Sequence, residues 1–64
     1  MNEIKIYCEG EEVETVNFED RESAENYFDT YPLDDTADKI ELWGIDPWGD
    51  FDLLDERVLV PDLG

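Results

Sequence analysis

Residues 39–55, KIELWGIDPWGDFDLLD, decide the fold that the rest of the chain completes. On both sides of Asp46-Pro47-Trp48-Gly49, large apolar residues alternate with acidic ones, a period of two that is typical of strands. Aspartate, proline and glycine are favoured at the first, second and fourth positions of a four-residue turn. The stretch therefore predicts a hairpin, with one strand leading into this turn and a second strand returning through Phe51 and Leu53.

The first part of the chain predicts another hairpin. Residues 3–8 alternate apolar and polar side chains, and residues 13–18 return with β-branched residues and a phenylalanine. Between them, Glu9-Gly10-Glu11 offers a glycine that tolerates a positive φ. We expect Cys8, the only cysteine, to be a small buried hydrophobe.

A helix is predicted between the two hairpins. Asp20 is a good N-cap, and Pro32 ends the helix because proline disfavours α geometry in the residue before it. Apolar residues recur at i, i+3, i+4 and i+7 between these limits, as expected for one buried helix face. The residues of this stripe are Ala24, Tyr27, Phe28 and Tyr31.

These elements predict an α+β fold, a single domain over residues 1–64 of order ββαββ, with the helix packed on one face of a mainly antiparallel sheet. Whether the apolar run 58–60 continues the last strand through a bulge or forms a short strand of its own stays open. The predicted core consists of Ile4, Ile6, Val16, Phe18, Ala24, Phe28, Tyr31, Ile40, Leu42, Ile45, Phe51, Leu53 and Val58.

Charge is the outlying property of the chain. Twenty acidic residues face four basic ones, which gives a net charge of −16 with no histidine. Such self-repulsion destabilises a compact state, so we expect the charge to have a function. Duplex DNA carries one charge per roughly 1.7 Å, so sixteen charges match about 27 Å of duplex. A globule of this chain length has a diameter of roughly 28 Å. The protein therefore carries about the charge of a DNA segment of its own length.

The predicted partner-binding residues are acids of the helix, of the polar connector 33–38 that follows it, and of the second hairpin. One tryptophan, Trp43 or Trp48, suits an exposed interface anchor, while the alternative that both complete the core is equally open. We expect the acids to share one connected surface. The predicted binding residues are Glu22, Glu25, Asp29, Asp34, Asp35, Asp46, Trp48, Asp50 and Asp52.

The sequence lacks the residue patterns that catalytic and metal-binding sites require. A Ser/His/Asp triad needs histidine, and Cys8 has no histidine to activate it. A calcium loop started at Asp46 or Asp50 places an apolar residue at a ligand position and a non-glycine at the glycine position. We therefore expect a non-enzyme without cofactor or metal. The sequence shows no membrane span or signal peptide, so we expect a cytoplasmic protein.

Three non-enzymatic functions fit this composition. A DNA mimic would occupy the basic nucleic-acid groove of another protein and would not bind nucleic acid itself, because a carboxylate array can gain affinity where phosphates do. Adaptation to a high-salt cytoplasm also produces acidic, lysine-poor domains. An acidic interaction module would contact a basic protein that does not handle nucleic acid.

Part of the chain resembles ArdA-type antirestriction proteins, which are DNA mimics carried by phages and plasmids. The resemblance lies in the acidic helix with Ala24 to Tyr31, the proline at Pro32, the strand Glu41 to Asp46 and the turn Trp48 to Phe51. It covers about half of the chain, and those proteins are much longer. The overall profile is also similar to small acidic anti-CRISPR proteins of phages. The resemblance implies a phage anti-defence protein acting in the host cytoplasm on a CRISPR effector or a restriction enzyme.

Overall fold

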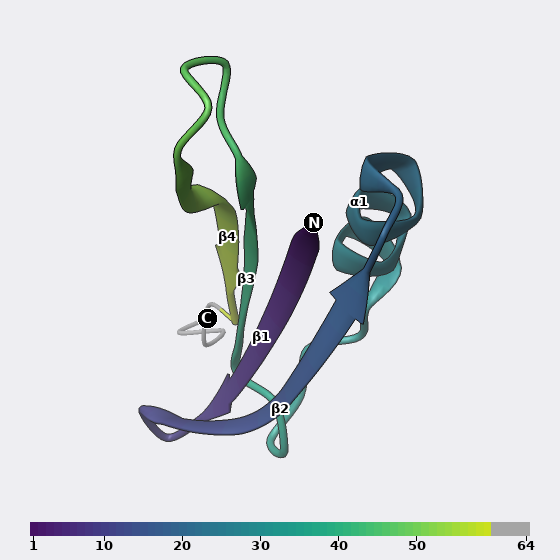
Figure 1. Cartoon of the computed structure of the whole chain (residues 1–64). Helices are drawn as coiled ribbons and strands as arrows, with labels where there is room; N and C mark the ends of the chain where they lie inside the picture. The colour runs from purple at the N-terminus through teal and green to yellow at the C-terminus, as the bar shows by residue number, and fades with distance from the viewer. Residues whose placement is uncertain (60–64) are drawn as a thin grey trace.

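The computed structural model describes residues 1–59 as a four-stranded antiparallel sheet with one helix, which confirms the predicted α+β fold of order ββαββ. The strands lie side by side in the order β2-β1-β3-β4, so β2 and β4 are the edges (Figure 1). No helix among the described residues is long and apolar enough to cross a membrane. The elements are β1 (Asn2–Cys8), β2 (Glu11–Phe18), α1 (Arg21–Thr30), β3 (Lys39–Ile45) and β4 (Phe51–Val58).

Both hairpin turns form where the sequence predicts them. Glu9 and Gly10 have φ values of 53° and 84°, which is the pair of positive angles that a two-residue type I′ turn requires. In the β3–β4 turn, the Gly49 N–H donates to the Asp46 carbonyl at 3.0 Å, and Gly49 has a φ of 89°. A glycine in this left-handed conformation lets the chain reverse tightly into β4.

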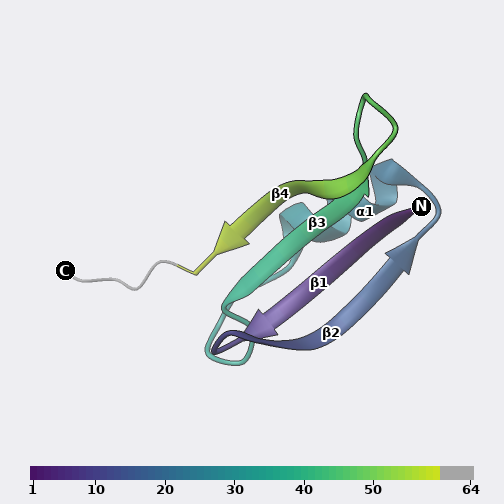
Figure 2. The ribbon, with the colours of Figure 1, turned by 60° about the vertical axis from the view of Figure 1, so that its left-hand side comes forward.

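Helix α1 begins and ends at the predicted residues and covers one face of the sheet (Figure 2). The Asp20 carboxylate accepts a hydrogen bond from the Ser23 N–H at 2.8 Å, so Asp20 is the N-cap. After Thr30 the chain leaves the helix at Tyr31, whose N–H still donates to the Tyr27 carbonyl at 3.0 Å. Pro32 follows at once and prevents a further turn.

The core lies between α1 and the sheet face that α1 covers. At Gly44 of β3 this core has no room for a side chain. A Cβ there would come within 2.9 Å of both Asn2 Oδ1 and Leu54 Cδ1. The buried apolar residues are Ile4, Ile6, Ala24, Phe28, Ala37, Ile40 and Leu42, and the partly buried residues around them are Val16, Phe18, Tyr27, Tyr31, Leu33 and Leu54.

Four residues predicted for the core lie outside it. Ile45, Phe51, Leu53 and Val58 are 43%, 44%, 38% and 52% exposed. Successive side chains on a strand point to opposite faces of the sheet. Because Leu42 and Ile45 are an odd number of positions apart on β3, the Ile45 side chain lies on the face opposite to the buried Leu42. Phe51 pairs with Ile45 and shares that face.

A bulge in β4 explains how the strand still reaches the core. Leu53 pairs with Trp43, and Asp55 pairs with Leu42, so Leu54 is the additional residue between them. Leu54 packs against the core in place of the predicted Leu53. The bulge also answers the question left open for the last strand, because β4 continues through it as far as Val58. Val60, the end of the apolar run, lies outside the described residues.

Two arginines join the helix to the sheet. Arg21, the first residue of α1, donates to Asn2 Oδ1 and to the Ile45 carbonyl, both at 2.8 Å. Arg57 of β4 donates to the Phe28 and Tyr31 carbonyls at 2.6 and 3.0 Å, and so satisfies the carboxyl end of the helix from the sheet. Half of the basic residues therefore form hydrogen bonds that connect the helix and the sheet.

Candidate partner-binding surface

The outer face of α1 carries three of the predicted binding residues. Glu22, Glu25 and Asp29, here called the helix acids, are exposed and spaced by three and four residues. At 1.5 Å per residue this places them about 4.5 and 6 Å apart along the helix axis and on one side of it. The helix acids thus form a row of carboxylates on a rigid element.

The connector acids, Asp34 and Asp35, lie at the other end of the helix, beside the β1–β2 turn. The Cys8 thiol, which is half-buried, donates to the Asp35 carbonyl at 3.5 Å and ties the connector to this turn. Asp34 Oδ1 accepts hydrogen bonds from the Thr36 hydroxyl and N–H at 2.7 and 2.8 Å. These bonds from Thr36 lower the pKa of Asp34, so this acid keeps its charge while it holds the connector in shape.

The tip of the β3–β4 hairpin carries the remaining residues. Asp46 Oδ1 accepts from the backbone N–H groups of both Trp48 and Asp50 at 2.9 Å. Asp46 is therefore a structural residue of the turn as well as an acid. Trp48 is 85% exposed, which decides between the two tryptophans: it is Trp48 that projects into solvent, while Trp43 is half-buried. Asp50 and Asp52 are exposed beside it.

These groups are distributed along the molecule and do not form a single cluster. The hairpin tip projects at the end of the sheet where α1 begins, and the connector acids lie where α1 ends (Figure 1). The helix acids lie between these two ends. Arg21 interrupts the acidic surface, since its guanidinium stands between the start of α1 and the end of β3.

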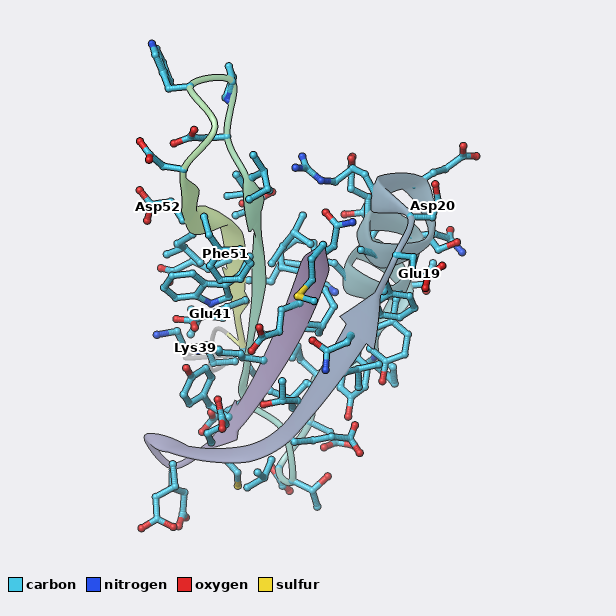
Figure 3. The ribbon with its side chains drawn as sticks, in the orientation of Figure 1. Glu19, Asp20, Lys39, Glu41, Phe51 and Asp52 are labelled. Carbon is cyan, nitrogen blue, oxygen red and sulfur yellow. The ribbon has the colours of Figure 1, made fainter. Side chains whose placement is uncertain are left out.

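The two lysines lie on the sheet face turned away from α1. Lys5 lies 4.8 Å from the centre of the Trp43 ring and 4.0 Å from the Glu3 carboxylate. Lys39 lies 3.1 Å from Glu41 (Figure 3). Regular alternation along β1 and β3 would have placed both lysines on this face. Arg21 donates to the sheet and Arg57 to the end of the helix, so all four basic side chains have partners inside the chain.

Glu41 is the one acid among the described residues that is buried, and it accepts a hydrogen bond from the Trp43 indole at 2.9 Å. Burial works to raise the pKa of Glu41, but hydrogen bonds from Trp43, Tyr7 and Lys39 outweigh it, and the pKa ends below its usual value. For Tyr7, burial and then the Glu41 hydrogen bond and charge raise the pKa to about 12. The hydrogen bonds from Trp43, Tyr7 and Lys39 thus keep the buried Glu41 carboxylate charged.

Within residues 1–59, no three His, Cys, Asp or Glu side chains are grouped as they would be to hold a metal ion. The arrangement offers rows of exposed carboxylates on rigid elements and one exposed tryptophan at a braced turn. No protein-family model matches the sequence, and no curated protein or solved structure matches it either.

Proposed function

We propose that this protein is a DNA-mimic inhibitor. It occupies the nucleic-acid groove of a bacterial defence complex, a CRISPR effector or a restriction enzyme, and blocks the binding of target DNA. The observation that carries the proposal is a net charge of −16 on a folded domain whose four basic side chains are all engaged internally. The exposed carboxylates of α1, the connector and the hairpin tip therefore have no basic side chain of their own to neutralise them, apart from Arg21 nearby.

The dimensions of the molecule suit this function. The domain extends over 41 × 20 × 20 Å, longer and narrower than the sphere expected from chain length. DNA as long as the longest extent carries about 24 phosphate charges, and the net charge of the chain is about two-thirds of that number. One acid, Asp62, lies outside the described residues, so the described part carries slightly less.

The mechanism is electrostatic competition. A groove lined with lysine and arginine gains affinity from each phosphate that it neutralises, and prearranged carboxylates supply the same interaction. The helix acids are held by a capped helix and Asp46 by a braced turn, so little conformational freedom is lost on binding. Because like charges repel, the protein does not bind DNA itself.

Two matched charge reversals test which surface binds. The first replaces Glu22, Glu25 and Asp29 with lysine, and the second replaces Glu11, Glu12 and Glu14 of the edge strand β2. Both change the net charge equally and both alter exposed residues. The measurement is displacement of labelled DNA from purified RNA-guided CRISPR effectors and restriction enzymes. We expect the helix variant to inhibit tenfold or more weakly, and the β2 variant to change inhibition about threefold at most.

Equal losses in the two variants would contradict the assignment of the surface, since net charge alone would then determine binding. A single reversal within the helix acids should weaken inhibition only slightly, because each exposed carboxylate contributes about 0.2–1 kcal/mol. Circular dichroism of both triple variants establishes that α1 is retained.

A second candidate function is an acidic interaction module that binds a basic protein unrelated to nucleic acid. Trp48 is the observation that favours it, because an 85% exposed indole on a rigid turn has no counterpart in a phosphate backbone. Replacing Trp48 with alanine separates the two functions. For a DNA mimic, the loss of affinity should be smaller than that of the helix variant, whereas for a module anchored by Trp48 it should be larger.

A further inference from the structure

The sheet face turned away from α1, here called the open face, carries exposed apolar side chains along β3 and β4. An antiparallel sheet covered on one side normally presents polar residues on the other. Here the Trp43 and Phe51 rings stack with their centres 6.1 Å apart, and Leu53 pairs directly with Trp43. Figure 3 shows Phe51 and Glu41 on this side of the sheet, away from Glu19 and Asp20 at the start of α1. Exposed apolar side chains that adjoin in this way mark a binding surface.

The charge on the open face differs from that on the rest of the molecule. Both lysines lie on it, and all three ion pairs of the described residues are there, formed with Glu3, Glu41 and Glu56. The open face therefore carries charges of both signs as well as the aromatic residues. On the helix side, by contrast, both arginines are held by hydrogen bonds to the fold, and the helix acids face solvent.

This difference in charge indicates which partner each surface fits. A strongly basic groove is attracted most to the helix acids and least to the face that carries the lysines. A strongly acidic partner is repelled by the helix acids and least repelled by the open face. The acidic partner that is always present at matching concentration is a second copy of this chain. We propose that two copies pack through their open faces and form a symmetric dimer.

The open face also contains the charge pairs that a two-fold interface needs. In such an interface, a residue of one copy meets a different residue of the other, and the same contact is repeated by symmetry. The Lys5 and Lys39 side chains are 28% and 36% exposed, and that of Glu56 is 48% exposed. Each copy therefore offers accessible charges of both signs beside the apolar centre formed by Phe51 and Leu53.

The size of the open face predicts a reversible dimer. Four strands of seven or eight residues cover roughly 25 by 19 Å, which is about 480 Å² for each copy and about 960 Å² for two. A specific interface needs about 1,000 Å², so this one is at the lower limit. Packing of the two sheets leaves both α1 helices on the outside, and the helix acids of both copies stay accessible.

Sedimentation velocity of the full chain, from micromolar to millimolar concentration and from low to molar salt, tests the dimer. We expect a monomer–dimer equilibrium that shifts toward dimer as salt rises, because screening weakens the repulsion between two acidic copies. Binding to a basic groove has the opposite salt dependence. The experiment needs no target, so its result is independent of the proposed function. A chain that stays monomeric at millimolar concentration in molar salt would overturn the inference.

A variant that leaves the net charge unchanged locates the interface. Replacing Phe51 with glutamate and Leu53 with lysine removes the apolar centre, and we expect dimerisation to weaken at least tenfold. The control carries the same two charges on the outer face of α1, Asn26→Lys with Thr30→Glu, and should dimerise like the original chain. Persistence of the dimer in the Phe51/Leu53 variant would show that another surface is used.

Amide chemical shifts of the unmodified chain provide a readout that does not depend on the folding of any variant. On dilution, the shifts that change should be those of residues on the open face, led by Trp43, Phe51 and Leu53. Changes confined to the outer face of α1, or changes on the open face only after a basic protein is added, would contradict the dimer.

Discussion

Glu41 shows how a single carboxylate is kept charged in the fold, and its neighbours set the response to alkaline pH. The pKa of Tyr7 is raised from 10.0 to about 12, first by burial and then by Glu41. The pKa of Lys39 is raised above 10.5 by the Glu41 hydrogen bond and charge. Both values are higher in the folded state. Their contributions to stability are therefore complete below pH 10 and decline as the pH rises through the folded pKa values.

We predict that the free energy of unfolding falls between pH 10 and about 12, and that Tyr7→Phe makes this fall shallower. The variant should also lose about 1 kcal/mol at pH 8, because Glu41 loses one hydrogen bond. Denaturant titrations from pH 8 to 12 measure both effects. If the variant and the original chain decline in parallel, Tyr7 is not the titrating group. The lowered pKa of Glu41 has the opposite sign, and its contribution is lost as the pH falls below its ordinary value of 4.5.

At the scale of elements, Arg57 connects the edge strand β4 to the carboxyl end of α1. Its two hydrogen bonds to helix carbonyls are charge-assisted, and the helix has no basic residue in its own last turn. We predict that Arg57→Met lowers the free energy of unfolding by about 2–3 kcal/mol. Hydrogen exchange of the amides near Thr30 should accelerate in the same variant.

Lys5→Met is the matched control for that prediction, since it removes the same charge from a partly exposed ion pair on the sheet. Its effect should be about 1 kcal/mol or less. Equal effects in thermal or denaturant unfolding would mean that net charge, and not the attachment of α1 to β4, determines the loss.

Local signals predicted most of the elements correctly. The alternation of β1, the cap at Asp20 and the stop at Pro32 each act within a few residues, so the sequence is sufficient to recognise them. Ile40 and Leu42 are buried as predicted, but the assignment of Ile45, Phe51, Leu53 and Val58 to the core was wrong, because both faces of the last two strands carry apolar residues. With one helix to cover two apolar faces, only topology decides which face is buried. The bulge at Leu54 changes the register further and has no signal in the sequence.

The candidate site was predictable in part. Exposure of the helix acids follows from the apolar stripe on the other side of α1, and the structure shows those acids exposed. Their relation to the other acids depends on how the chain returns to the sheet after α1, which places the connector and the β3–β4 turn toward opposite ends of α1 (Figure 1). The partners of the basic residues depend on the same long-range contacts. For these reasons the acids could be identified from the sequence, but which of them lie close together could not be predicted.

At the scale of the whole molecule, self-repulsion is the dominant electrostatic property. We predict that the melting temperature at pH 7 rises continuously from low to molar salt, because screening relieves repulsion among carboxylates that lack basic neighbours. Calorimetry at low protein concentration measures the effect without a contribution from the dimer. A melting temperature that does not change would contradict the account, and a requirement for molar salt to fold would favour adaptation to a high-salt cytoplasm.

As a DNA mimic, the protein competes with DNA for one groove. The most direct measurement is a gel shift that combines a purified defence complex, its labelled target DNA and increasing amounts of this protein. We predict that DNA is released as protein is added, that protein and DNA never migrate together, and that the protein alone does not shift DNA. A ternary complex that retains DNA at saturating protein would contradict the claim and would place the protein elsewhere on its target.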